Sequence, residues 1–433
     1  MQVIKYPTRN TWDELIRRPT ISTAVLEQSV RAILKAVQAN GDKALRNYSQ
    51  KFDRIKLDSL AVTQSEIEQT VAGIKAELKQ AISVAKANIS RFHRTQFEKT
   101  KPIETTPGVR CWRKSVPIER VGLYIPGGTA PLFSTVLMLG IPARLVGCQE
   151  IVLCTPPDKF GQINPVILYS AYILGIDKIF KVGGAQAIAA MAYGTETIPK
   201  VYKIFGPGNQ YVTIAKQLVS TEGVAIDLPA GPSEVLVIAD DKADPELIAV
   251  DLLAQAEHGA DSQVILITDS EPQIENVLQA ITQQIENLPR KSIAKQALTH
   301  SKSILVKNLK TAVQLSNYYA PEHLIIQTEN ATALAKEVTN AGSVFIGSWT
   351  PESAGDYASG TNHTLPTNAY ARSYSGVSLD SFLKKITFQQ ISPQGLQKLG
   401  PAIECLAEEE SLRAHRNAVT IRLEKIGRSA NND

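Results

Sequence analysis

The sequence predicts an α/β protein with two parallel-sheet units, preceded by helices and followed by a helical C-terminal tail. Three observations predict this class. Short strand-like runs alternate with helix-like stretches of about 12–20 residues, as in βαβ units. Nine such runs spread over about 230 residues, which suits two sheets better than one. Helical periodicity without strand-like runs fills the first hundred residues and the residues after Thr367.

The composition is that of an ordinary folded protein. The chain has 433 residues, of which 43% are hydrophobic and 20% are charged. A disordered chain lacks the apolar residues to form a core, so these values argue against disorder. The net charge of +4 is not concentrated in a long Lys/Arg run, so neither a nucleic-acid groove nor a membrane-binding face is expected. No apolar run reaches the roughly 18–20 residues that span a bilayer.

The N-terminus and the cysteines predict a cytoplasmic protein. The first residues lack the charged-then-apolar layout of a signal peptide. The four cysteines form no CxxC pair and no metal-ligand spacing, so we expect free thiols in a reducing compartment. A catalytic cysteine is an alternative, although buried structural thiols are commoner. The cysteines are Cys111, Cys148, Cys154 and Cys405.

The N-terminal helical region is expected over residues 1–107. An amphipathic helix over residues 29–38 should stop at Asn40-Gly41, which is a typical C-terminal signal. Thr63 and Glu66 have the spacing of a capping box, in which each side chain satisfies an orphan backbone N–H. One long helix should follow, because apolar residues continue at helical spacing. They are Ile67, Val71, Ile74, Leu78 and Ile82.

The strand-like runs define two α/β units. The first is expected over residues 108–225 and the second over residues 226–366, with the divide near residues 225–232. A helical tail should occupy residues 367–433 and include a helix over residues 402–424. The expected strands are 121–125, 151–154, 178–182, 201–205, 235–239, 264–268, 303–306, 324–326 and 344–346.

Glycine-rich turns follow several expected strands, but none has a known nucleotide-binding spacing. The chain contains neither the GxGxxG fingerprint of dinucleotide-binding proteins nor a GxxxxGK[ST] phosphate loop. Glycines at strand-to-helix turns let the backbone approach a ligand, and helix N-termini favour phosphate. Nucleotide binding and ordinary turns are both compatible with this pattern. The turns are Pro126-Gly127-Gly128, Gly183-Gly184, Gly206-Pro207-Gly208-Asn209 and Gly231-Pro232-Ser233.

Histidine is scarce, with six in the chain, and four lie in segments rich in carboxylates and amides. Asp244-Pro245 is a strong helix start, and Gln255 and His258 would share a face of the helix that it opens. Pro321 favours an extended Ala320, which would place Glu322-His323 at the start of a strand.

A metal site is one interpretation of these segments. Zinc in proteins takes imidazole nitrogen and carboxylate oxygen, which His258, Asp356 and His415 would supply. Their wide separation in the chain means that tertiary folding must assemble them. The alternative for each histidine is an ordinary surface or satisfied core residue.

Taken together, these segments resemble the L-histidinol dehydrogenase family over nearly the whole chain. So many long motifs in one order are specific to a family. The motifs are Val121-Gly-Leu-Tyr-Ile-Pro-Gly-Gly128, Val182-Gly-Gly-Ala-Gln-Ala187, Ile204-Phe-Gly-Pro-Gly-Asn209, Pro229-Ala-Gly-Pro-Ser-Glu234, Gln255-Ala-Glu-His-Gly259, Ala320-Pro-Glu-His323 and Gly355-Asp-Tyr-Ala-Ser-Gly-Thr-Asn-His363.

The resemblance implies an NAD-dependent oxidation of L-histidinol to L-histidine through L-histidinal, the last step of histidine biosynthesis. It implies two incomplete Rossmann-like units, the first on the NAD side and the second carrying metal and catalytic residues. It also implies a homodimer with a shared active site, in which the tail crosses the interface. The implied acid/base residues are Glu322 and His323, and the implied NAD contacts are Tyr124, Gln186 and Asn209. The implied ligands of one zinc ion per subunit are Gln255, His258, Asp356 and, across the dimer interface, His415. The implied substrate contacts are Ser233, Gln255, His258, His323, Asp356, Glu410 and His415.

The sequence departs from the family pattern at one position in the tail. The family usually has glycine after the glutamate, whereas this chain reads Glu410-Ser411-Leu412. Serine adopts positive φ angles less readily than glycine. If the backbone requires such an angle there, the placement of Glu410 is affected.

The residue types suit the implied chemistry. Zinc that binds the substrate imidazole and amine would hold the carbinol carbon in place, and positioning can be worth about 7–11 kcal/mol. His323 would take the hydroxyl proton, and Glu322 would activate the water that hydrates the aldehyde.

Three other functions remain open on the sequence. A zinc-dependent hydrolase would use Glu322 to activate a metal-bound water and would need no NAD. A non-catalytic nucleotide- or metal-binding protein would leave the adjacent Glu322-His323 pair without a purpose. A two-electron alcohol dehydrogenase would differ only in its stoichiometry.

Overall fold

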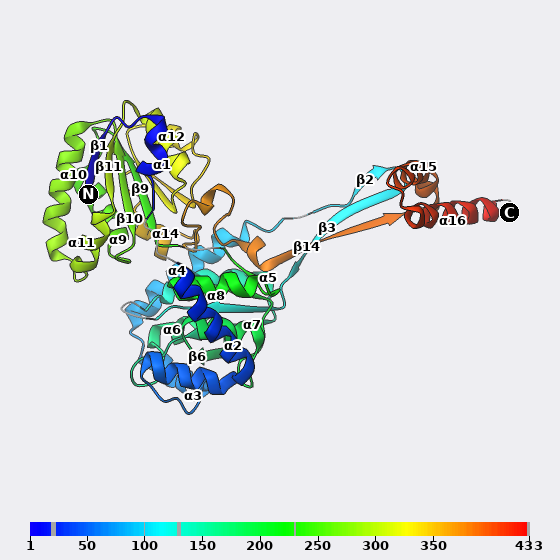
Figure 1. Ribbon diagram of the computed structural model, residues 1–433, viewed down its shortest axis with the longest axis horizontal. Coiled ribbons are helices and arrows are strands. Elements are labelled where there is room, and N and C mark those ends of the chain that lie inside the picture. The colour runs from blue at the N-terminus through cyan, green and yellow to red at the C-terminus, as the bar shows by residue number, and fades with distance from the viewer. Residues whose placement is uncertain (19–22, 99, 128–130, 229–230, 431–433) are drawn as a thin grey trace. The chain divides into compact units, whose positions relative to one another are not determined.

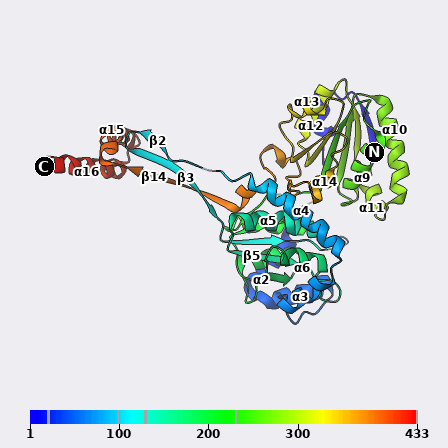
Figure 2. The same ribbon diagram turned by 180° about the vertical axis from the view of Figure 1, so that it is seen from behind.

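The computed structural model describes residues 1–18, 23–98, 100–127, 131–228 and 231–430. The chain divides into two compact units. Unit 1 comprises Met1–Gln96 and Ile118–Phe382 and contains two parallel sheets with helices on both faces. Unit 2 comprises Phe97–Pro117 and Leu383–Asp433 and contains an antiparallel sheet and a pair of helices. Both are drawn in Figures 1 and 2. The predicted α/β class with two parallel-sheet units is confirmed.

Lobe 1 of unit 1 is built on a five-stranded sheet in the order β6-β5-β4-β7-β8. All neighbouring strands are parallel. Counted from β4, the order is 3-2-1-4-5, which is the Rossmann order without its sixth strand. The strands are β4 (Arg120–Tyr124), β5 (Glu150–Thr155), β6 (Lys178–Lys181), β7 (Lys203–Phe205) and β8 (Ala225–Ile226).

Seven helices cover the two faces of this sheet. Helices α2, α7 and α8 pack on one face, and helices α3, α4, α5 and α6 pack on the other. The central strands are apolar on both faces, as expected for a parallel sheet buried between helices. The helices are α2 (Thr23–Tyr48), α3 (Gln64–Gly73), α4 (Ala76–Arg94), α5 (Phe133–Val146), α6 (Pro165–Tyr172), α7 (Gly184–Tyr193) and α8 (Gln210–Ser220).

Lobe 2 of unit 1 is built on a six-stranded parallel sheet in the order β1-β11-β10-β9-β12-β13. Counted from β9, its last five strands repeat the 3-2-1-4-5 order of lobe 1. Strand β1, from the N-terminus of the chain, adds to the outer edge of β11. The strands are β1 (Gln2–Lys5), β9 (Glu234–Ala239), β10 (Gln263–Thr268), β11 (Lys302–Leu305), β12 (His323–Gln327) and β13 (Ser343–Ile346).

Helices also cover both faces of the lobe 2 sheet. Helices α9, α10 and α11 pack on one face, and α1, α12 and α13 pack on the other (Figures 1 and 2). A short helix, α14, follows β13. The helices are α1 (Trp12–Leu15), α9 (Pro245–Ala256), α10 (Glu271–Gln284), α11 (Lys291–Thr299), α12 (Leu309–Tyr319), α13 (Ala331–Ala335) and α14 (Glu352–Tyr357).

Unit 2 has little core of its own. Its antiparallel sheet has the order β14-β3-β2, and its two helices pack against each other. The apolar side chains of unit 2 that are buried are Val109, Ala407 and Val419, among the described residues. The elements are β2 (Ile103–Thr106), β3 (Val109–Pro117), β14 (Leu383–Ile391), α15 (Pro393–Glu409) and α16 (Arg413–Ala430).

Most of the predicted elements are present. Each of the nine predicted strands overlaps a strand of the two parallel sheets. The capping box of Thr63 and Glu66 is formed with both of its hydrogen bonds. The predicted helix stop at Gly41 is a kink, at which φ is +48° and the helix direction changes within α2. None of the described helices is long and apolar enough to cross a membrane.

Four predictions about secondary structure were wrong. The helix expected over residues 402–424 is divided between α15 and α16 by a turn at Ser411, whose φ is +58°. The helix expected through residues 67–82 is two helices, because Ile74 has an extended backbone that ends α3. The N-terminal region is not wholly helical, because residues 2–5 form strand β1. Strands do not end at Thr367, because β14 pairs along its whole length with β3. Most of the β14 side chains are exposed on both faces, so the strand lacks the alternation by which strands are predicted.

The proposed domain limits at residues 107, 225 and 366 stay predictions. The two sheets of unit 1 are nevertheless separated in sequence between β8 and β9, and the predicted divide near residues 225–232 lies there. Residues 229–230 of that divide are outside the described part of the chain.

Candidate active site

The predicted acid/base pair lies at the amino edge of the lobe 2 sheet. Strand β9 begins at Glu234 and strand β12 begins at His323, and these two strands are neighbours in the sheet. Helix α9 runs back from the carboxyl edge, so its last turn, which carries Gln255, returns to the amino edge. Asp244 caps the first turn of α9, and Pro245 begins it, as predicted. Residues distant in the chain therefore meet at one edge of one sheet.

The turn before Glu322 differs from the prediction. Ala320 was expected to be extended because it precedes Pro321, but its backbone is left-handed, with φ of +56°. Ala320 ends helix α12, and its N–H donates to the carbonyl of Ser316 at 2.8 Å. The helix-ending turn outweighs the preference of a residue before proline. The second part of the prediction is correct, because His323 begins strand β12.

The backbone of Glu234 holds both members of the Glu322-His323 pair, through the two peptide groups that flank its Cα. Its N–H donates to Glu322 Oε2 at 2.9 Å, and its carbonyl lies 3.1 Å from His323 Nδ1. A carbonyl only accepts, so Nδ1 carries the proton of this hydrogen bond. Both side chains are buried, with 7% of Glu322 and 4% of His323 exposed. The pair is therefore fixed by the backbone of a neighbouring strand.

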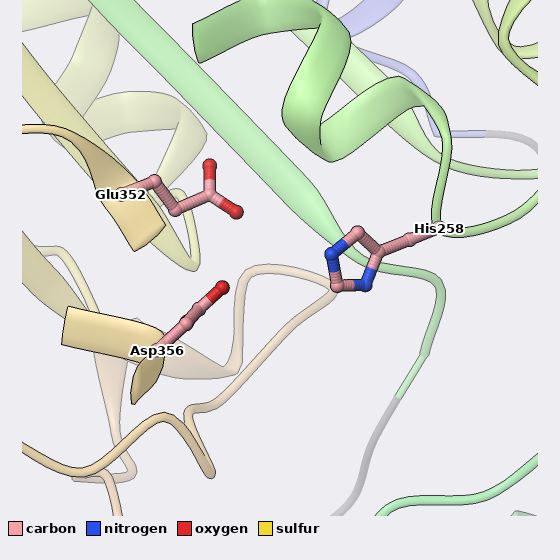
Figure 3. A group of neighbouring side chains, drawn as sticks. All are labelled: His258, Glu352 and Asp356. Carbon is pink, nitrogen blue, oxygen red and sulfur yellow. The ribbon is translucent and has the colours of Figure 1, made fainter. Parts of the chain in front are cut away.

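A group of metal-ligand type lies beside this pair. His258, Glu352 and Asp356 each offer one ligand atom, and these atoms lie within 4.8 Å of one another (Figure 3). His258 was expected to share a helix face with Gln255, but α9 ends at Ala256, so His258 lies in the turn that follows the helix. Both carboxylates belong to α14. His323 Nε2 is 3.6 Å from Asp356 Oδ1, which connects the group to the acid/base pair.

Glu352 was missed in the sequence analysis. Glu352 and Asp356 are four residues apart, so on a helix they share one face. Pro351 precedes them at the N-cap of α14. Two carboxylates at this spacing after a proline were the available signal.

Gln255, a predicted ligand, lies against the same group. With its amide nitrogen toward Glu352, it donates to that carboxylate, and its oxygen accepts from the Glu234 N–H at 2.9 Å. With its amide oxygen toward Glu352, two acceptors face each other, an arrangement that a bound cation favours. The side chain can therefore serve the site with or without a metal ion.

The site has an excess of buried negative charge. Burial raises the pKa of Glu322 to about 7 and that of Glu352 to about 8. Burial alone would lower the pKa of His323. The surrounding carboxylates, of which Glu352 has the largest effect, raise this pKa well above its usual value. A positive charge beside these buried carboxylates would therefore stabilise their ionised forms.

A divalent cation fits this environment. Among the described residues, Glu352 Oε2 and His323 Nε2 are buried side-chain atoms without a hydrogen-bond partner. A buried polar atom without a partner is costly, and a cation would satisfy the free carboxylate oxygen. One imidazole and two carboxylates are a donor set that zinc accepts. The residues present thus fit a metal ion.

Lobe 1 contains a cavity of about 750 Å³ at the carboxyl edge of its sheet. Its lining includes Tyr124, Gln186 and Asn209, which were the predicted NAD contacts. Tyr124 ends β4 and Asn209 caps α8 after β7, and the order of the sheet reverses between these two strands. Ligands of open α/β sheets bind at this point, and cavities of 300–1,000 Å³ are typical of small-molecule sites.

Three of the glycine-rich turns contribute lining residues to this cavity, among them Gly127, Gly184 and Asn209. A Cβ on Gly206, whose φ is +126°, would lie 2.0 Å from the Tyr124 carbonyl, so only glycine fits. The buried pair of Lys216 and Asp227, 2.5 Å apart, holds this turn. Lys216 donates to the Gly206 carbonyl, and the Gly206 N–H donates to Asp227, each at 2.8 Å. The Gly184 N–H donates to the Tyr124 hydroxyl at 3.0 Å. Gly128, which follows Gly127, lies outside the described residues.

The remaining predicted residues lie apart from these two sites or at their margin. Ser233 is half-buried and directly precedes Glu234. Glu410 and His415 are exposed side chains of unit 2, so their predicted roles stay predictions. Burial raises the pKa of Cys148 to about 12, which disfavours a reactive thiolate there.

Comparisons with known proteins agree with one another. The sequence model of the family described as histidinol dehydrogenase matches residues 16–423. A histidinol dehydrogenase of Bacteroides thetaiotaomicron is 60% identical over 98% of this chain and 100% of the relative. One from Vibrio vulnificus is 53% identical over 96% of each chain. The crystal structure of histidinol dehydrogenase from Elizabethkingia anophelis has a TM-score of 0.96, with 56% identity over 99% of each chain.

Proposed function

The chain belongs to the histidinol dehydrogenase family of oxidoreductases, and on this premise we propose that it oxidises L-histidinol to L-histidine through L-histidinal with two molecules of NAD⁺. The observation that carries the proposal is the buried Glu322-His323 pair beside a cation-binding group. A hydrolase would use such a group too, but family membership favours the oxidation.

In this proposal the metal ion is zinc, and its ligands within the chain are Gln255, His258 and Asp356. Glu352 is added to these candidates because its carboxylate reaches the same point. When bound there, zinc would supply a Lewis acid that holds the imidazole and amine of the substrate. Ser233 is proposed as a further substrate contact.

His323 is proposed to take the hydroxyl proton of histidinol. Its Nδ1–H donates to the Glu234 carbonyl, so Nε2 is the atom that is left to exchange a proton. A cation bound to the carboxylates would offset the negative charge that raises the pKa of His323, so that Nε2 can act as a base. Nε2 faces Asp356 and has no hydrogen-bond partner among the described residues, so a substrate hydroxyl could take that place.

Glu322 is proposed to activate the water that adds to the aldehyde. Its pKa of about 7, raised by burial, lies near neutral pH, where a carboxylate can both take and return a proton. The Glu234 N–H holds one carboxylate oxygen and leaves the other to bind water. The hydrate then carries the hydrogen that the second oxidation removes.

NAD⁺ is proposed to bind the cavity of lobe 1 and to accept a hydride in each oxidation. Tyr124, Gln186 and Asn209 line it. Helices α7 and α8 begin at its margin, at Gly184 and Gln210, and the N-terminal end of a helix suits a pyrophosphate. The cavity needs no GxGxxG fingerprint for this role.

The protein is proposed to work as a homodimer in which Glu410 and His415 complete the site of the partner subunit. Unit 2 supports this proposal because its exposed apolar side chains have too little core of their own to cover them. They include Leu406, Leu412 and Ile421, of which 68%, 43% and 53% are exposed.

The proposal is tested by the NADH formed per L-histidinol consumed, with histidinol limiting, NAD⁺ in excess and Zn²⁺ added. We expect two NADH per substrate. One would mean that the reaction stops at the aldehyde, as in a two-electron alcohol dehydrogenase, and would overturn the role of Glu322. None, with folded protein and bound metal, would overturn histidinol as the substrate.

A further inference from the structure

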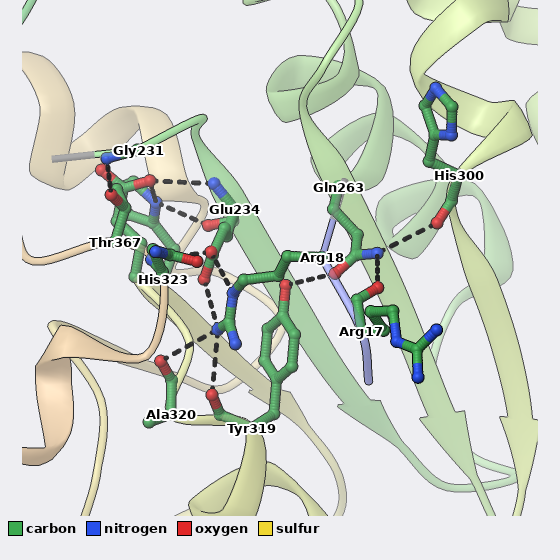
Figure 4. Close-up of polar contacts among 12 residues, drawn as sticks. Arg17, Arg18, Gly231, Glu234, Gln263, His300, Tyr319, Ala320, His323 and Thr367 are labelled. Atoms are coloured by element: carbon green, nitrogen blue, oxygen red, sulfur yellow. Dashed lines mark hydrogen bonds and ion pairs between the residues drawn. The ribbon is translucent and has the colours of Figure 1, made fainter. Parts of the chain in front are cut away.

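A buried ion pair lies directly behind the Glu322-His323 pair. Arg18, which follows α1 near the N-terminus, forms a two-pronged ion pair with Glu234 (Figure 4). Arg18 Nη2 lies 2.8 Å from Glu234 Oε2, and Arg18 Nε donates to Oε1. The exposed fractions of the two side chains are 12% and 2%. A segment near the N-terminus of the chain thus contacts the amino edge of the lobe 2 sheet.

Glu234 connects this ion pair to the acid/base residues. Its carboxylate is held by Arg18 and by the N–H of Asn368 at 2.8 Å. Its backbone, in turn, holds Glu322 through the N–H and His323 through the carbonyl. Fixing the Glu234 side chain at two points restricts movement of the Cα and of the two peptide groups beside it. The orientation of both proposed acid/base groups therefore depends on one residue.

Arg18 also holds the turn that leads into the pair. Its Nη2 donates to the carbonyl of Tyr319 at 2.9 Å and lies 3.5 Å from that of Ala320. Its guanidinium carbon is 3.9 Å from the centre of the Tyr319 ring, at cation–π distance. Ala320 has the left-handed backbone of the turn, two residues before Glu322. Arg18 thus reaches the pair by two routes, through Glu234 and through this turn.

We propose that Arg18 is a positioning residue, which orients Glu322 and His323 through the Glu234 backbone and the Tyr319–Ala320 turn. The kinetic test of this inference rests on the proposed function, whereas its structural test does not. Arg18 touches neither His258 nor Asp356 in its hydrogen bonds and ion pairs within the described residues, so its role is separable from metal binding. A lysine cannot replace it fully, because an ammonium lacks the planar fork that grips a carboxylate at two points.

The kinetic test compares Arg18→Lys and Arg18→Met with Arg17→Ala in the full-length, zinc-loaded protein. Arg17 is the adjacent arginine, and its side chain is exposed. We expect Arg18→Met to lower kcat about 100-fold, because misplaced groups cost about this much, with the KM for histidinol within about twofold. Arg18→Lys should lie between wild type and Arg18→Met. Arg17→Ala should leave both constants unchanged.

A second variant separates positioning from folding. Arg18→Met alone leaves the Glu234 carboxylate buried and unpaired, which destabilises proteins. Arg18→Met combined with Glu234→Gln removes both charges and keeps an acceptor for Asn368. We expect it to melt close to wild type while kcat stays at least about tenfold lower. Wild-type kcat in this folded double variant would overturn the proposal, as would a rise in KM alone.

Crystal structures of the double variant and of Arg17→Ala provide a readout that does not depend on turnover. In the double variant we expect His323 Nδ1 to lose its hydrogen bond with the carbonyl of residue 234, and Glu322 Oε2 to lose its hydrogen bond with the N–H of residue 234. In Arg17→Ala both should remain. If both remain in the double variant, the proposal is wrong. If wild type does not oxidise histidinol, the proposed function fails, and these structures still decide whether Arg18 positions the pair.

Discussion

Glu352 and Asp356 project from neighbouring turns of helix α14 toward one point, which His258 also reaches. Two carboxylates so close together repel each other, and only 1% of Glu352 is exposed to water. Folding has thus brought two carboxylates into a place where a cation would lower the free energy of both. This relationship makes the metal site testable without measuring catalysis.

The first prediction concerns metal affinity. We expect Glu352→Gln and Asp356→Asn each to weaken Zn²⁺ binding at least about tenfold, because each removes a charge from the group. Titration of metal-free protein with Zn²⁺ in a calorimeter measures the effect. Glu337→Gln, which alters an exposed carboxylate elsewhere, is the control. Unchanged affinity in both site variants would contradict a metal site at this point.

The second prediction divides the two oxidations between Glu322 and His323. His323→Ala should block both oxidations, because in each one the hydroxyl on the reacting carbon must lose its proton. Glu322→Gln should slow mainly the oxidation of histidinal, by about 10²–10⁴-fold, because it removes the base for water. Rates measured separately with histidinol and with histidinal test this.

The Glu322→Gln variant is nearly isosteric, so its result is informative about chemistry. An amide oxygen at position 322 can still accept from the Glu234 N–H, so His323 should keep its place. Equal losses in both half-reactions for Glu322→Gln would refute the division of roles.

The parts of the fold that the sequence predicted are those with strong local signals. The strands of the two sheets are continuous apolar runs, because helices bury both of their faces. The caps at Thr63 and Asp244 depend on residues only two or three positions apart. Such signals are complete within a short window of the chain.

The parts that the sequence did not predict depend on distant partners. Strand β1 has four residues and is defined by pairing with β11, about three hundred residues away in the chain. Ala320 takes its left-handed conformation from the end of α12 against the preference set by Pro321. The two-pronged ion pair of Arg18 and Glu234 was not predicted, because the two residues are far apart in the sequence. Residue types alone suggested His258, Asp356 and His415 as metal ligands, but the predicted roles of Gln255, Glu322 and His323 came from the resemblance to a family.

The third prediction concerns the cavity of lobe 1. Tyr124→Phe removes the hydroxyl that accepts the Gly184 N–H, and Gly184 begins helix α7 at the cavity. The loosened turn should raise the KM for NAD⁺ about tenfold, since an unpaired buried donor costs about 1–3 kcal/mol. The KM for histidinol should not change. Steady-state kinetics with each substrate varied in turn measure both constants.

Tyr193→Phe is the matched control for this variant. Tyr193 ends the same helix, and its hydroxyl donates to Glu222 at an exposed position. The same substitution there should leave both KM values unchanged. If Tyr124→Phe changes the KM for histidinol more than the KM for NAD⁺, the assignment of this cavity to NAD⁺ is wrong.

The fourth prediction tests the shared site of the proposed homodimer. His415→Ala and His323→Ala should each be inactive alone. In a hybrid dimer, one site would combine an intact His323 with His415 of the partner subunit. Random mixing of subunits should therefore restore about a quarter of wild-type activity. Mass spectrometry of intact dimers verifies the exchange, and absence of activity after proven exchange would count against a shared site.

The last prediction concerns the position at which the chain departs from the family pattern. Ser411 has φ of +58°, so the backbone there does adopt the left-handed conformation that glycine favours. It ends α15 in a Schellman motif, in which the Leu412 N–H donates to the Ala407 carbonyl at 2.8 Å and the Ser411 N–H donates to the Glu408 carbonyl at 2.9 Å.

A left-handed backbone at a residue other than glycine costs about 1–2 kcal/mol of stability. Replacing that residue by glycine recovers only part of this cost, because glycine is more flexible in the unfolded chain. Ser411→Gly should therefore stabilise the protein by about 0.5–1 kcal/mol. Ser411→Ala, which removes the hydroxyl but keeps Cβ, should not. Melting temperatures of both variants decide the matter, and equal stabilisation by alanine and glycine would show that backbone strain at Ser411 is not the cause.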